Sequence, residues 1–202
     1  MAGYIESVEE LRRHFAEPTG RTVKKQLARL DVHCRNFIQH SPFVVVASES
    51  GGRLDASPRG GEPGFVKVVD DVTLWIPDAP GNNLLDTLAN VVASGRAGLL
   101  FLVPGVDETL RVNGAARVSI DPEKLAEFAS EKRTPRVVLE VVVEEAFLHC
   151  AKALMRSRLW SDEARQPRSV LPTMGQMLAD QIGTSGPVET QAEMVARYQP
   201  LL

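Results

Sequence analysis

Residues 51–90, GGRLDASPRGGEPGFVKVVDDVTLWIPDAPGNNLLDTLAN, are the segment around which the rest of the chain is organised. It holds three short runs of strand-forming residues bounded by Gly, Pro or Asp, followed by an amphipathic run that is typical of a helix. Alternate side chains of an extended run share one face. In the first run the shared polar face consists of Arg53, Asp55, Ser57 and Arg59. The segment therefore predicts three strands and a helix, and the first strand presents a face suited to water or a charged ligand.

The turn Pro80-Gly81-Asn82-Asn83 leads into the predicted helix, which should run from Asn83 to about Ser94. The first backbone amides of a helix have no partner within the helix and favour a bound anion. Two arginines, Arg53 and Arg59, lie a short way before this helix start. Phosphate binds both guanidinium groups and free amides, so the arrangement predicts a phosphate site.

The rest of the chain adds strands on both sides of this segment. PFVVVAS (42–48) is a β-branched run, and we expect it to form a meander of four antiparallel strands with the three strands above, the last two joined as a hairpin through Asp70-Asp71. Further strands are predicted in GLLFLVPG (98–105), TLRVNGAARVSID (109–121) and RVVLEVVVEEAFLHC (136–150). Gly114 should mark a bulge. Short loops and few helices favour an antiparallel β-barrel or a strongly coiled sheet over a doubly wound fold.

Helical segments are predicted at both ends of the chain. A capping box starts at Ser7, and an apolar stripe predicts a single helix from about Thr22 to Gln39. We expect residues 1–40 to pack on the barrel as a helical segment. Beyond Trp160 the apolar residues are too irregularly spaced for an independent domain, so residues 161–202 should form a C-terminal extension that wraps the barrel or a partner subunit.

Composition excludes several functional classes. The chain of 202 residues has a net charge of −3 and a pI near 5.9, which provides no basic field for nucleic acid or an anionic membrane surface. Its first residues lack the apolar run of a signal peptide, and no stretch reaches the length of a membrane span. Two cysteines are too few for a disulfide framework and fit a reducing compartment, so we expect a cytoplasmic protein. The spacing of His and Cys favours no metal site.

Four motifs, in order, resemble the split-barrel flavoproteins related to pyridoxamine 5′-phosphate oxidase. They are DASPRGG (55–61), PGNNLLDTL (80–88), ETLRVNG (108–114) and HCAKALMRSRLW (149–160). The resemblance covers about residues 40–160. It implies a mainly β, α+β fold, a six- to seven-stranded antiparallel split β-barrel with peripheral helices, in which residues 41–160 bind FMN. It also implies a homodimer with two FMN molecules at the subunit interface.

The resemblance also assigns cofactor-binding residues. On the flavin-facing strand and at the helix start these are Arg53, Ser57, Arg59, Asn82 and Asn83, and between them Lys67 and Trp75. The segment that closes over the cofactor contributes Lys152, Arg156 and Trp160. Leu84 stands where related sequences often carry a basic residue. The arginine-rich substrate motif of true pyridoxamine 5′-phosphate oxidases is missing from the end VARYQPLL, so that activity is not implied.

Each of these residues has an alternative role in the fold. The two arginines of the predicted strand could form ion pairs with Asp55 or Glu62 on a solvated strand. Trp75 could belong to the core. The two asparagines could serve only the turn and the helix cap, and the basic residues of the closing segment could line a solvent-exposed helix face.

The leading hypothesis is an FMN-dependent oxidoreductase that acts on a small molecule. Flavin chemistry needs little from side chains beyond binding, orientation and control of solvent, so we assign no catalytic residue. Two other classes stay open: a non-catalytic flavin-binding or flavin-storage protein, and a split-barrel protein that binds haem or another anionic ligand. The chain has no G-x-G-x-x-G, Walker or G-x-S-x-G motif, which argues against Rossmann, P-loop and serine-hydrolase chemistry.

Overall fold

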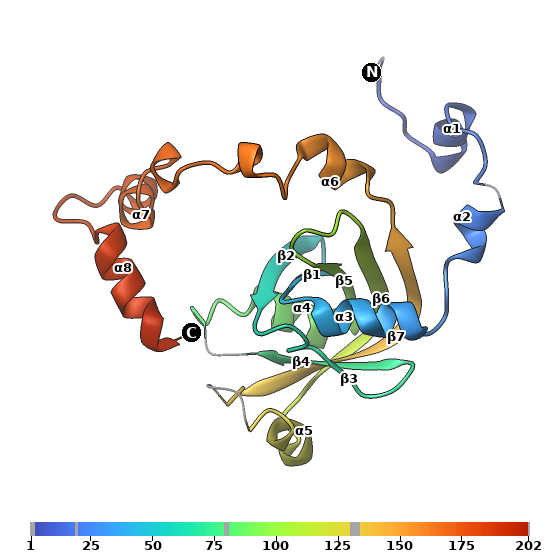
Figure 1. Ribbon diagram of the computed structural model, residues 1–202, viewed down its shortest axis with the longest axis horizontal. Helices are drawn as coiled ribbons and strands as arrows, with labels where there is room; N and C mark the ends of the chain where they lie inside the picture. Colours follow the sequence, from blue (N-terminus) through green and yellow to red (C-terminus); the bar gives the residue numbers. More distant parts are fainter. Residues whose placement is uncertain (1–2, 19, 79–80, 130–133, 202) are drawn as a thin grey trace.

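The structure, a computed structural model, describes residues 3–18, 20–78, 81–129 and 134–201. Within these residues one antiparallel sheet of seven strands has the order β2-β1-β5-β6-β7-β4-β3 (Figure 1). The strands are β1 (Phe43–Ser50), β2 (Arg53–Gly60), β3 (Lys67–Val68), β4 (Thr73–Asp78), β5 (Arg96–Leu102), β6 (Thr109–Ser119) and β7 (Val137–His149). The sheet coils around a core but stays open, since its edge strands β2 and β3 do not pair with each other in the described part. The predicted mainly β, antiparallel α+β fold is confirmed.

The predicted meander of four strands is wrong. The hairpin of β3 and β4 forms through Asp70-Asp71 as expected, but it pairs with β7 at the far edge of the sheet, while β2 pairs only with β1. The connection between β2 and β3 carries Phe65 and Val66, both buried in the core. Because these two side chains must reach the core, the connection crosses the end of the barrel and delivers β3 to the opposite edge.

Short helices surround the sheet. They are α1 (Val8–Arg13), α2 (Arg21–Lys24), α3 (Val32–His40), α4 (Asp86–Ser94), α5 (Pro122–Ala126), α6 (Lys152–Ser157), α7 (Met174–Ile182) and α8 (Gln191–Tyr198), with 3-10 turns at Asp162–Ala164, Arg168–Val170 and Gln199–Leu201. Ser7 caps α1 as predicted, accepting a hydrogen bond from the Glu10 amide at 3.0 Å. Among the described residues, no helix combines the length and the apolar character that a membrane crossing requires.

The predicted helix from Thr22 to Gln39 is divided into α2 and α3. Asp31 is the N-cap of α3. Its carboxylate accepts a hydrogen bond from the Cys34 amide at 2.8 Å, so a new helix starts here and the predicted helix is interrupted. Between the two helices Leu27 makes a β-bridge with Ala146 of β7. Only α3 contributes side chains to the core among these first helices.

Gly114 marks a bulge, as predicted. The register between β6 and β7 shifts at Asn113 and Gly114. A Cβ atom at Gly114 would lie 2.0 Å from the carbonyl oxygen of Val142, so no other residue fits this close approach of the two strands without moving the backbone.

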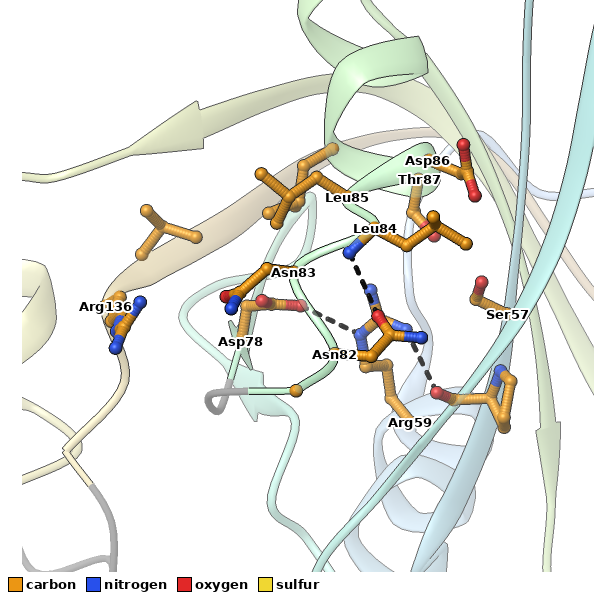
Figure 2. Close-up of a pocket in the computed structure, with 14 residues that line it drawn as sticks. Ser57, Arg59, Asp78, Asn82, Asn83, Leu84, Leu85, Asp86, Thr87 and Arg136 are labelled. Atoms are coloured by element: carbon orange, nitrogen blue, oxygen red, sulfur yellow. Dashed lines mark hydrogen bonds and ion pairs between the residues drawn. The ribbon is translucent and has the colours of Figure 1, made fainter. Parts of the chain in front are cut away.

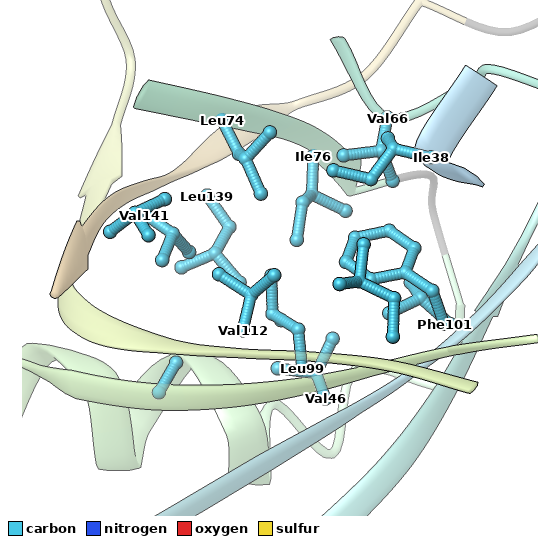
Figure 3. Packing of buried hydrophobic residues seen from close by; sticks show 14 of the residues in the cluster. Ile38, Val46, Val66, Leu74, Ile76, Leu99, Phe101, Val112, Leu139 and Val141 are labelled. Carbon is cyan, nitrogen blue, oxygen red and sulfur yellow. The ribbon is translucent and has the colours of Figure 1, made fainter. Parts of the chain in front are cut away.

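The core fills the inside of the coiled sheet. Figure 3 shows aliphatic side chains of β1, β4, β5, β6 and β7 packed with Phe101 in one cluster, which Ile38 enters from α3. Every strand except β2 and β3 contributes a fully or nearly fully buried apolar residue. The side chains of β2 are therefore not needed for the core, and its polar face can bind a ligand.

A C-terminal arm, residues 161–201, extends away from the barrel. In Figure 1 the arm curves outward from α6 through α7 to α8, and α1 and α2 lie on the other side of the barrel, where Lys25 at the end of α2 contacts β7. Many apolar side chains of the C-terminal arm are exposed, namely Val170, Leu171, Met174, Leu178, Ile182, Val195 and Tyr198.

Candidate flavin-phosphate site

A cavity of about 480 Å³ lies where the polar face of β2 meets the start of α4. Its walls come from β2, the end of β4, the segment 81–88 and the start of β7. In Figure 2 Ser57 and Arg136 lie on opposite sides of the cavity, and Arg59 lies between them. The cavity thus brings together Ser57, Arg59, Asn82 and Asn83 of the predicted set.

Arg59 is held in the cavity wall by two hydrogen bonds. Its Nε donates a hydrogen bond to Oδ1 of Asp78 at 3.0 Å, and its Nη1 donates to the carbonyl oxygen of Pro58 at 3.0 Å. The side chains of Arg59 and Asp78 are only 24% and 18% exposed. The ion pair therefore fixes the guanidinium in the cavity wall and leaves Nη2 as the donor that faces no protein partner among the described residues.

Arg53 is placed differently. Its side chain is 81% exposed, and Nη2 lies 3.4 Å from Oδ1 of Asp86 in the first turn of α4. It is not among the residues that line the cavity. Both arginines of β2 thus form ion pairs, as the alternative interpretation expected, but with acids later in the chain, Asp86 and Asp78, and not with Asp55 or Glu62.

Asp55 organises the centre of the polar face. Its carboxylate accepts hydrogen bonds from the hydroxyl of Ser57 at 2.9 Å and from the hydroxyl of Thr87 in α4. These bonds tie β2 to α4 and fix the Ser57 hydroxyl beside the cavity. The oxygen of that hydroxyl can still accept one further hydrogen bond.

The helix start differs from the prediction. α4 begins at Asp86, since Asn83 and Leu85 adopt left-handed backbone angles with φ of 60° and 61°. The side chain of Asn82 accepts a hydrogen bond from the Leu84 amide at 3.0 Å, which makes a turn of the kind that Asn favours. The helix start predicted at Asn83 is therefore wrong, and an acid, Asp86, occupies the first turn of α4. Pro80 of the predicted turn lies outside the described residues.

A sequence profile of the pyridoxamine 5′-phosphate oxidase family matches residues 30–150, more than half of the chain. The chain belongs to this family. A search of curated proteins found no match.

Solved structures with a similar fold include two of HupZ from Group A Streptococcus. A variant of HupZ is 16% identical with a TM-score of 0.51 over 59% of this chain and 99% of that one, and the other HupZ structure is 16% identical with a TM-score of 0.50 over 59% and 93%. The FAD binding protein from Mycobacterium smegmatis is 15% identical, with a TM-score of 0.43 over 61% and 97%. At this level of sequence identity, the similarity to HupZ shows a shared fold alone.

Two predicted residues of this family member, Lys67 and Trp75, lie outside the cavity. They are paired in the β3–β4 hairpin. The indole Nε1 of Trp75 donates to Oε2 of Glu140 at 3.0 Å, and the Lys67 amine bonds Glu127. In the single chain Trp75 thus belongs to a polar cluster on the outer face of the sheet, and Lys67 binds the C-cap of α5.

That polar cluster centres on Glu140, a nearly buried carboxylate. It also accepts hydrogen bonds from Arg117 at 2.8 Å and from Lys124. Burial raises the pKa of Glu140, but the hydrogen bonds from Lys124, Trp75 and Arg117 together outweigh burial, and the pKa lies below its usual value of 4.5. Glu140 is therefore ionised at neutral pH and stabilises the fold by binding Trp75, Arg117 and Lys124.

The three predicted residues of the closing segment also lie away from the cavity. Lys152 and Arg156 are exposed on α6. Trp160 donates its indole N–H to the carbonyl oxygen of Val106 at 2.9 Å, which fixes the base of the arm on the β5–β6 connection. In one chain they are not assembled with Arg59.

Three charged residues that line the cavity were not predicted: Asp78, Asp86 and Arg136. Asp78 and Arg136 meet because the end of β4 pairs with the start of β7, where Asp78 lies opposite Val137. Arg136 is exposed and forms no ion pair within the described residues. The sequence near Asp78 and Arg136 does not predict this pairing, because β4 and β7 are far apart in the chain. Likewise, no group of three His, Cys, Asp or Glu side chains in the described ranges is arranged to hold a metal ion.

Proposed function

We propose that this protein is an FMN-binding flavoprotein, an oxidoreductase that acts on a small molecule as a homodimer. The observation that carries the proposal is the orientation of β2, whose polar face, with Ser57 and Arg59, turns into the cavity beside α4. Membership of the pyridoxamine 5′-phosphate oxidase family supports a flavin as the ligand of this cavity.

The donors of the cavity fit the phosphate end of FMN. Nη2 of Arg59, the guanidinium of Arg136 and the amide groups of Asn82 and Asn83 are donors for phosphate oxygens, and the Ser57 hydroxyl is held close by. The basic residue often found at position 84 is absent, and Arg136 supplies a second positive charge in its place. When bound, the flavin supplies the redox chemistry, and the protein binds and orients it.

The acids of the cavity limit its affinity for phosphate. Asp78 competes with the ligand for Arg59, and Asp86 adds negative charge at the start of α4. Two arginines and two aspartates leave the cavity nearly neutral. We therefore expect binding through geometry and hydrogen bonds, with a modest contribution from net charge.

The other face of β2 supports the homodimer. Leu54 is 84% exposed, and Ala56 and Pro58 on the same face are exposed as well, while the polar face is the more buried one. An edge strand that points its apolar side chains to solvent is typical of a subunit interface. The partner would then cover this face and supply the contacts for the flavin ring that one chain lacks.

Buried Cys34 and the absence of any disulfide among the described residues agree with the reducing cytoplasm that we propose as the location.

The absorption spectrum of the purified protein tests the proposal. After incubation with FMN and removal of free ligand, we expect flavin bands at a ratio of one FMN per chain. A Soret band in the protein as purified, with no retention of FMN, would overturn the proposal in favour of a haem protein. Retention of FMN without electron transfer from any reduced donor to any acceptor would reduce it to flavin storage.

A further inference from the structure

A second group of basic side chains lies on the outer face of β6 and β7. We call it the Phe147 patch; it consists of Lys25, Arg111, Phe147 and His149. The Lys25 amine lies 5.3 Å from the centre of the Phe147 ring, and Cζ of Arg111 lies 5.4 Å from it. The ring of His149 is 6.5 Å from the same ring, centre to centre. None of these residues lines the cavity beside α4.

The fold fixes the patch from three segments. Arg111 lies opposite Phe147 in the β6–β7 register, and Thr109 lies opposite His149, so both pairs share one face. The segment after α2 is bound to β7 by two hydrogen bonds between Leu27 and Ala146, of 2.9 and 2.8 Å. This bridge brings the Lys25 amine to the carbonyl oxygen of Leu148 at 2.8 Å.

The positive charge of the patch is not balanced by an acid. Neither Lys25 nor Arg111 forms an ion pair with a carboxylate of the described residues. The nearest acid on the same face of β7, Glu145, accepts a hydrogen bond from the Asn113 side chain at 2.7 Å. Arg96 of β5 shows the contrast, because it binds Glu144 with two hydrogen bonds of 2.8 and 2.6 Å.

His149 lies close to the same two positive charges, and both affect its pKa. Its Nδ1 is buried and has no hydrogen-bond partner within the described chain. Burial, followed by the charges of Arg111 and Lys25, lowers the pKa of His149 below its usual value. Cation–π contacts with Phe147 explain why the two cations lie over the ring, but they leave the charge and the imidazole without an acceptor.

We propose that the Phe147 patch binds a small oxyanion, the phosphate group of an ester or a carboxylate. The Lys25 amine has two further N–H donors, and the guanidinium of Arg111 has five that meet no acceptor in the described residues. An oxyanion between them relieves the repulsion between the cations and stabilises a protonated His149. The proposal is independent of flavin binding, since the two sites share no residue.

Histidine NMR on the full-length protein tests the proposal, with inorganic phosphate and acetate as probes at constant ionic strength. The chain has four histidines, and His149→Gln identifies the His149 signal. We expect phosphate or acetate to shift this signal to saturation and to raise the pH at which it titrates. Saturation by phosphate alone assigns the patch to phosphate esters, and saturation by both extends it to carboxylates. Saturation by neither probe overturns the proposal.

Matched variants separate binding from general charge effects. Arg111→Gln should weaken the binding of the anion about tenfold or more, the effect of losing a charge-assisted hydrogen bond. Lys25→Gln should act in the same direction, and it serves as the second test if Arg111→Gln does not fold. Arg96→Gln changes the net charge equally and should leave the affinity unchanged. Equal affinity in Arg111→Gln, Lys25→Gln and the wild type would overturn the proposal, whatever the outcome of FMN titrations.

Discussion

Replacing Arg59 by alanine tests the proposed phosphate site directly. Nε of Arg59 is bonded to Asp78 and Nη1 to the carbonyl oxygen of Pro58, so Nη2 is the donor left for a ligand. A hydrogen bond between charged groups contributes about 1.5–3 kcal/mol, and a single bond with a competing acid nearby belongs at the lower end. We expect Arg59→Ala to weaken FMN binding by about 1.5–2 kcal/mol, which corresponds to a rise in Kd of about ten- to thirtyfold.

The assay compares two flavins. Titration by flavin fluorescence gives the Kd of FMN and of riboflavin, which has no phosphate group and should bind Arg59→Ala within about twofold of the wild type. Arg96→Ala is the control variant, because Arg96 pairs with Glu144 outside the cavity. Equal losses for FMN and riboflavin would contradict the proposed phosphate site, since they would show that Arg59 supports the local fold and does not bind the phosphate.

Two further variants sharpen the same test. Asp78→Asn removes the acid that competes for Arg59, so it should strengthen FMN binding while riboflavin stays unchanged. Arg53→Ala should weaken FMN binding less than Arg59→Ala, because the Arg53 side chain is 81% exposed and does not line the cavity. A larger effect at Arg53 than at Arg59 would move the phosphate to the open end of β2.

Four other predictions concern the fold and the assembly. Gly114→Ala should lower the free energy of unfolding by about 3 kcal/mol or more in urea titrations, because the new methyl group meets the Val142 carbonyl; a loss below about 1 kcal/mol would contradict the bulge geometry. The pKa of Glu140 is lower in the folded state, so its contribution to stability is full above the unfolded pKa near 4.5 and is lost as the pH falls through the folded pKa. Glu140→Gln should therefore lose less stability than the wild type between neutral pH and about pH 3, and parallel losses would exclude this role. Deleting residues 186–202 should lower the melting temperature or the retention of FMN, and no change in either would mean that the arm is free. Sedimentation at micromolar concentration should give a dimer, and a monomer would remove the basis for a shared flavin site.

Much of the fold could be predicted because its signals are local. The β-branched runs, the hairpin turn at Asp70-Asp71, the bulge at Gly114 and the helix end at Gly95 each depend on residues close together in sequence. The order of the strands could not be predicted in the same way. It depends on the burial of Phe65 and Val66, which sends the chain across the barrel.

In the candidate site, too, the local features could be predicted from the sequence and the tertiary contacts could not. Alternation along β2 correctly put Ser57 and Arg59 on one polar face, and the structure brings both into one cavity with Asn82 and Asn83. The partners of the arginines were missed, since Asp78 and Asp86 approach β2 only through tertiary structure. The helix start was placed three residues too early, because periodicity does not reveal the left-handed backbone of Asn83 and Leu85.

The order of the strands also bears on synthesis of the chain. β4 ends at Asp78, yet its partner β7 begins only at Val137, after α4, β5, β6 and α5 have been made. At ribosomal rates of about 5–20 residues per second, the β3–β4 hairpin waits on the order of several seconds with an unpaired edge and with Leu74 and Ile76 lacking their core. Pairings so distant in sequence form slowly and leave the nascent chain open to aggregation. The hairpin of β3 and β4 is therefore the part of the nascent barrel that stays exposed until His149 has left the ribosome.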